Sequence, residues 1–129
     1  MKKFKKGLVF VLALAMCFSC LGGIVAGARY SLFESVILTL NKSSVASCSA
    51  EITGNHNVTS ITATATLQRV ESNGTYTTVK LWSGLSAAGN EFYWSGSNAI
   101  EAGKTYRLKV VAVAHSASGN ETTTEYLTK

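Results

Sequence analysis

The amino-acid sequence predicts an all-β protein, a seven-stranded antiparallel β-sandwich preceded by a signal peptide. Two observations favour this fold class. Beyond residue 28, apolar residues recur at every second position, which is the period of a half-buried strand and not of a helix. The alternating runs are short, and turn-forming residues separate them, as in an antiparallel sandwich.

The first three runs show the alternation most clearly. Residues 33–41 carry apolar side chains on one face, and residues 45–53 alternate apolar residues with serine and glutamate. After the polar loop at 54–60, residues 60–70 have threonine at nearly every other position. The side chains expected to face the core are Val36, Leu38, Leu40, Ala46, Cys48, Ala50, Ile52, Ile61, Ala63, Ala65 and Leu67.

The second half of the chain completes the seven strands. Asn73-Gly74 can supply a positive φ at both central positions of a turn, so a tight hairpin to a strand at 75–83 is expected. Small residues at 84–90 predict a loop before a short, central strand at 92–95, whose Phe92 and Trp94 are expected in the core. Residues 105–115 alternate again, with Tyr106, Leu108, Val110, Ala112 and Ala114 on one face, and residues 121–128 form the last strand.

Residues 1–28 have the layout of a secretory signal peptide. Four lysines lie within the first six residues, an uncharged run follows from Gly7, and this run ends in Ala26-Gly27-Ala28. The pattern predicts a secreted, extracellular protein, with cleavage after Ala28 and one domain at 29–129. Two alternatives stay open: an uncleaved leader that anchors the chain in the membrane, and lipid attachment at Cys20.

Most of the positive charge lies in this leader. The chain has 12 basic and 7 acidic side chains, and removal of the four leader lysines leaves 8 against 7, a net charge of +1. A nearly neutral domain exerts little long-range attraction on nucleic acid or anionic lipid. We therefore expect no nucleic-acid partner, and contact with a membrane only through an uncleaved leader.

Two of the three cysteines also fall in the leader. Cys48 is then alone in an exported domain, so no intramolecular disulfide can form. Its place on the apolar face of residues 45–53 predicts a buried, inert thiol and a monomeric domain. An intermolecular disulfide is the alternative.

The tripeptide Gly103-Lys104-Thr105 has the last three residues of a phosphate-binding loop. Such a loop also needs a glycine five positions earlier, where this chain has Asn98, and a helix that begins at the lysine. Residues 106–114 alternate as a strand instead. The tripeptide therefore predicts a turn before a strand, and no nucleotide or other cofactor is expected.

Residues 100–110, Ile-Glu-Ala-Gly-Lys-Thr-Tyr-Arg-Leu-Lys-Val, resemble the corner before strand F of fibronectin type III domains, within the wider group of immunoglobulin-like sandwiches. In that family an apolar residue, a glycine and a tyrosine recur at the spacing of Ile100, Gly103 and Tyr106. The resemblance implies that Tyr106 is a structural corner tyrosine whose hydroxyl bonds to an upstream backbone group. Ala102 stands where the family often has proline. The chain is also similar to small, uncharacterised secreted bacterial proteins with a leader and one such domain.

Three residues of the strand at 75–83 form the candidate partner-binding site. Strict alternation places Val79 and Leu81 inward and puts Tyr76, Lys80 and Trp82 together on the outer face. Exposed aromatic rings can anchor a protein or stack on a sugar. The alternative is that this edge strand bulges and one ring folds over the open side of the core.

The sequence has few residues that could serve catalysis. No aspartate is present after the leader, and only His56 and His115 could act as the base for a serine nucleophile. Glu51, His56, His115 and Glu121 are the only plausible metal ligands, and their scatter predicts no metal site. The sequence thus predicts a non-catalytic module that interacts with a protein or the cell surface. Carbohydrate or cell-wall binding is the second hypothesis, and a small hydrolase is the third.

Overall fold

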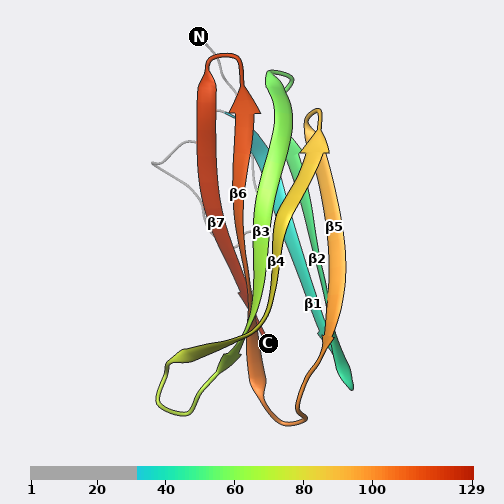
Figure 1. Ribbon diagram of the computed structural model, residues 1–129, viewed down its shortest axis with the longest axis vertical. Helices are drawn as coiled ribbons and strands as arrows, with labels where there is room; N and C mark the ends of the chain where they lie inside the picture. Colours follow the sequence, from blue (N-terminus) through green and yellow to red (C-terminus); the bar gives the residue numbers. More distant parts are fainter. Residues whose placement is uncertain (1–31) are drawn as a thin grey trace.

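The computed structural model describes residues 32–129, which form seven antiparallel strands in two layers, with β1 and β2 passing behind β3 and β4 (Figure 1). The strands are β1 (Phe33–Lys42), β2 (Val45–Gly54), β3 (Val58–Val70), β4 (Tyr76–Ala88), β5 (Glu91–Ala99), β6 (Thr105–Ser116) and β7 (Gly119–Thr128). One sheet has the order β1-β2-β5 and the other β4-β3-β6-β7. The prediction of an all-β fold with seven antiparallel strands is confirmed, and the two sheets are compatible with a sandwich.

The predicted leader at 1–28, its cleavage site and Cys20 lie outside the described residues. Within the part of the chain that the structure describes, no helix has the length and apolar character needed to cross a membrane.

The core lies between the two sheets and is built from the alternating residues. The inner faces expected for β2, β3 and β6 are confirmed, and several of their positions hold alanine, which lets the sheets approach closely. Val36 and Leu38 of β1 only pack against this core, because β1 is an edge strand. The largest fully buried side chains are Tyr106, Leu40, Ile52, Ile61, Leu67, Leu108 and Val110.

Two strands are longer than alternation predicts. The loop expected at 84–90 is mostly strand, since β4 continues to Ala88 through a bulge at Gly84, whose φ of 70° suits glycine. The strand expected at 92–95 extends to Ala99 because its serine-rich end pairs with β2 from Val45 onward. β5 is also an edge strand, and not the central strand that was expected for Phe92 and Trp94.

The connection from β3 to β4 differs from the tight hairpin that Asn73-Gly74 predicted. Five residues, 71–75, separate the strands, and the turn closes where Gly74 N donates to Glu71 O at 3.0 Å. Asn73 Oδ1 accepts hydrogen bonds from Thr75 N at 3.1 Å and from Thr75 Oγ1 at 2.7 Å. Asn73 therefore contributes through its side chain, in an Asx-type turn.

The Gly103-Lys104-Thr105 segment leads into β6, so the strand expected there is confirmed. Tyr106 is fully buried, and its Oη accepts a hydrogen bond from Glu101 N at 2.9 Å. Ile100 packs against the core, and Gly103 has a φ of 78° in the turn. The three residues singled out at this corner thus lie within one turn that is closed by the tyrosine hydroxyl.

Cys48 lies inward on β2 opposite Gly96, and burial raises the pKa of its thiol to about 11. Because the thiolate is the reactive form, a thiol reagent should label the native protein slowly and the urea-unfolded protein at the ordinary rate. Labelling at equal rates in both states, or a dimer that reduction abolishes, would contradict this expectation.

Glu125 turns inward on edge strand β7, where burial raises the pKa of its carboxyl despite a 2.7 Å hydrogen bond from Thr123 Oγ1. The folded state then binds this proton more tightly than the unfolded state, so stability falls as pH rises above the ordinary value of 4.5. Glu125→Gln should therefore stabilise the fold at neutral pH and have little effect in acid. Urea unfolding at both pH values tests this, with the exposed Glu51→Gln as control, and equal stability of Glu125→Gln and wild type at neutral pH would contradict it.

Candidate functional site

The three residues expected on one outer face of β4 lie on two sides of the strand. Tyr76 pairs with Val70, and Trp82 pairs with the fully buried Ala65. Since residues opposite each other in an antiparallel pair project to the same side of the sheet, Tyr76 lies on the outer face and Trp82 on the inner side. Lys80 is exposed but belongs to the same side as Trp82.

A β-bulge separates Tyr76 from Trp82 and explains this correction. The register shifts where β4 has Val79 as an extra residue opposite Leu67. Val79 still packs against the core, but the alternation beyond it reverses, so that Leu81 is exposed. A strict period of two therefore assigns the wrong side to Lys80, Leu81 and Trp82.

Trp82 closes the open side of the two layers together with Trp94 of β5. Their ring centroids are 4.9 Å apart at an interplanar angle of 61°, an edge-to-face contact between the edge strands of the two sheets. A Cβ at Gly96 would lie 2.8 Å from Trp94 Cζ2 and 3.0 Å from Trp82 Cε2 and Nε1. Gly96 is thus needed for the close approach, and Trp82 packs against the core as a structural residue.

The outer face of the four-stranded sheet has a different aromatic group, the Tyr-Arg-Tyr cluster, formed by Tyr76, Arg107 and Tyr126. The Arg107 Cζ atom lies 3.6 Å from the ring centroid of Tyr76 and 4.4 Å from that of Tyr126. Arg107 Nε donates to Gln68 Oε1 at 2.8 Å. Side chains from all four strands therefore hold one guanidinium between two rings, an arrangement that suits the planar cation of arginine.

This cluster is exposed and lies in a positively charged environment. Tyr76 is 46% and Tyr126 52% exposed. Lys109 projects to the same side, because it pairs with Tyr126, whereas the two glutamates of β7 pair with inward-facing residues of β6. Among the described residues of these four strands, no carboxylate lies on the outer face. The face thus offers apolar rings and cations without competing acids.

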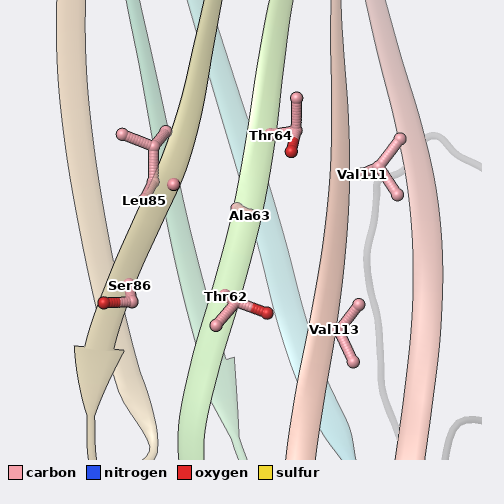
Figure 2. Close-up of a pocket in the computed structure, with 8 residues that line it drawn as sticks. Thr62, Ala63, Thr64, Leu85, Ser86, Val111 and Val113 are labelled. Carbon is pink, nitrogen blue, oxygen red and sulfur yellow. The ribbon is translucent and has the colours of Figure 1, made fainter.

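A shallow hollow of about 330 Å³ lies further along the same sheet, near the Gly84 bulge (Figure 2). Its lining is Thr62, Ala63, Thr64, Gly84, Leu85, Ser86, Val111 and Val113. Hydroxyl and methyl groups line the hollow, and none of these side chains titrates near neutral pH. The lining side chains include the hydroxyls of Thr62, Thr64 and Ser86, but no carboxylate, imidazole or amine.

The histidines and glutamates considered for catalysis or metal binding do not converge. His115 Nε2 lies 3.0 Å from Thr62 Oγ1 on the outer side of the four-stranded sheet, while Glu51 faces outward on the three-stranded sheet. His56 lies in the exposed turn before β3, and Glu121 accepts a hydrogen bond from Leu32 N at 2.8 Å. Residues 32–129 contain no group of three or more histidine, cysteine or acidic side chains that could hold a metal ion.

Sequence reasoning missed two members of the Tyr-Arg-Tyr cluster, Arg107 and Tyr126. Alternation within residues 105–115 does place Arg107 outward, and the threonine-rich pattern of the last strand places Tyr126 with the polar residues. These signals indicate the exposed side of each strand. They do not reveal that the starts of β4 and β6 and the end of β7 meet at one end of the sheet (Figure 1).

The fold and this surface define a two-sheet, antiparallel β protein with an exposed aromatic and cationic patch. Models of protein families, curated proteins and solved structures were each compared with the chain, and none of them matches it.

Proposed function

We propose that the chain is an exported, non-catalytic module of fibronectin type III or immunoglobulin-like form that binds a protein partner through the Tyr-Arg-Tyr cluster. The observation that carries the proposal is the guanidinium of Arg107, held between two exposed tyrosine rings on a face without carboxylates. Export rests on the leader-like pattern of residues 1–28.

The sheet order supports the fibronectin type III form over the constant-type immunoglobulin form. With the strands lettered A, B, C, C′, E, F and G in chain order, the sheets are A-B-E and C′-C-F-G. In the constant-type order the fourth strand joins the sheet of strands A, B and E, whereas β4 pairs with β3. The bond from Glu101 N to the Tyr106 hydroxyl also supports a tyrosine corner.

A protein partner fits the chemistry of the cluster. Tyrosine and arginine are enriched among residues that dominate binding energy, because they offer much contact area and directional hydrogen bonds. Arg107 already holds both rings, so little side-chain entropy remains to be lost on binding. No partner for the terminal Nη atoms of Arg107 lies within residues 32–129, which leaves them able to receive a carboxylate.

Carbohydrate binding is the weaker candidate at this place. A sugar stacks on a free aromatic face, but each tyrosine already presents one face to Arg107. Trp82, the other aromatic residue considered for stacking, packs against Trp94. A small hydrolase finds no support, since His115 has Thr62 and no carboxylate as its side-chain partner in the described part of the chain.

A site-specific photo-crosslinker tests the proposal in the native host. Placed at Tyr126, it should give a discrete adduct that protease digests, while the same group at exposed Ser118, in the β6-β7 turn, should not. Arg107→Lys keeps the charge but loses the planar stacking, and we expect the adduct yield to fall about tenfold. An adduct that only glycosidases remove would establish carbohydrate binding. Equal adducts at Tyr126 and Ser118 would refute a specific binding surface at the Tyr-Arg-Tyr cluster.

A further inference from the structure

The outer face of the three-stranded sheet carries a second exposed patch of opposite charge. Ile37 pairs with Glu51, and Glu51 pairs with Tyr93, so one row across β1, β2 and β5 reads apolar, acidic, aromatic. Ile37 is 54% and Tyr93 66% exposed. Glu91 projects to the same side, next to Tyr93 along β5. We call this row together with Glu91 the acidic face.

The four-stranded sheet carries a matching row. Leu81 pairs with Thr66, Thr66 with Lys109, and Lys109 with Tyr126, so the row reads apolar, polar, cationic, aromatic. Arg107 lies two residues before Lys109, on the same side of β6. We call this row together with the Tyr-Arg-Tyr cluster the basic face. Lys109 and Tyr126 are neighbours across one strand spacing, as are Glu51 and Tyr93, and that spacing is about 4.8 Å.

We infer that the partner of the basic face is a second copy of this chain, which presents its acidic face. The inference rests on the proposed function and names the partner of the same site. Glu51 of one copy would meet Lys109 and Arg107 of the next. Ile37 would then cover the ring of Tyr126, and Tyr93 would lie over Thr66, beside Leu81. Apolar contact supplies the attraction, and the opposite charges set the orientation.

The charge distribution selects head-to-tail contact over a twofold dimer. Two acidic faces, or two basic faces, would bring like charges together, which disfavours an isologous interface through either face. The two faces lie on opposite sheets, so each copy can bind one neighbour on each side and the assembly is open-ended. Without the four leader lysines, residues 29–129 hold eight cations and seven glutamates. A net charge of +1 opposes such stacking only weakly, so we infer self-association in place of the monomer expected from sequence.

Charge-swap variants test this inference on the exported chain, recovered from the medium or extracted from the membrane with mild detergent. In sedimentation velocity, the average mass of the wild type should rise with concentration and fall with added salt. Glu51→Lys alone and Lys109→Glu alone should each weaken association about tenfold. An equimolar mixture of the two variants should associate again, because each then offers the face that complements the other. Lys104→Glu, in the turn before β6, is the control with the same charge change as Lys109→Glu and should associate like the wild type.

The outcomes separate the inference from the proposed function. A wild type that stays monomeric at every concentration overturns the inference. So does an association whose strength changes neither with added salt nor in the Glu51→Lys and Lys109→Glu variants. A monomeric wild type whose Tyr126 crosslinker still captures a different protein would leave the proposed function standing. Absence of both self-association and a discrete Tyr126 adduct would overturn both.

Discussion

Replacing Trp82 with alanine should lower the free energy of unfolding by about 3 kcal/mol, at the low end of the range for buried tryptophan because β4 is an edge strand. The loss has two sources: the apolar area that Trp82 buries against the core, and its edge-to-face contact with Trp94. The gap above Gly96 would also leave Trp94 without its neighbour on that side. Thermal and urea unfolding at low protein concentration measure the effect.

Lys80→Ala is the matched control for this prediction, since Lys80 is exposed two residues away on the same strand. We expect its unfolding free energy to stay within about 0.5 kcal/mol of the wild type. If Trp82→Ala instead melted like the wild type and lost partner capture, Trp82 would be a binding residue, and its packing against Trp94 would not matter to the fold.

Tyr106→Ala should have an effect of similar size, about 3–5 kcal/mol, because it removes the largest fully buried side chain. Tyr106→Phe keeps the ring but leaves Glu101 N without its 2.9 Å acceptor, and should cost about 1–2 kcal/mol. The difference in unfolding free energy between Tyr106→Ala and Tyr106→Phe gives the contribution of ring packing. The loss in Tyr106→Phe gives that of the corner hydrogen bond.

Tyr126→Phe provides the comparison for the hydroxyl, since Tyr126 is exposed and contacts Arg107 through its ring. Its urea midpoint should match that of the wild type. An unchanged midpoint for Tyr106→Phe as well would show that the corner hydrogen bond adds nothing to stability, and that Tyr106 acts through packing alone.

The strands with an uninterrupted period of two were predictable along their whole inner faces. Ala46, Ile52, Ile61 and Leu108 are buried where alternation places them, because β2, β3 and β6 are each paired on both sides. A central strand is held by two neighbours, so its pleat stays regular. Edge strands lack one neighbour, and there the predictions became less accurate.

β4 shows why one extra residue matters so much. The bulge at Val79 is invisible to a count of apolar and polar residues, yet it reverses the side of every residue that follows until the next irregularity. The expected group of Tyr76, Lys80 and Trp82 depended on an unbroken period across that position. The alternative that one ring folds over the open side of the core describes what Trp82 does.

Local chemistry determined the fold class, the inner faces of the central strands and the buried position of Cys48, since each depends on a pattern within a single strand. Only the tertiary structure decided which strands are neighbours, and therefore which side chains from distant segments share a surface. The Tyr-Arg-Tyr cluster forms because β4 and β6 both pair with β3, and β7 pairs with the far side of β6. Hydrogen bonds between the strands set the registers that bring the three side chains together. The pairing of strands is a property of the whole packed molecule, and a surface assembled from several strands can be read only once that pairing is known.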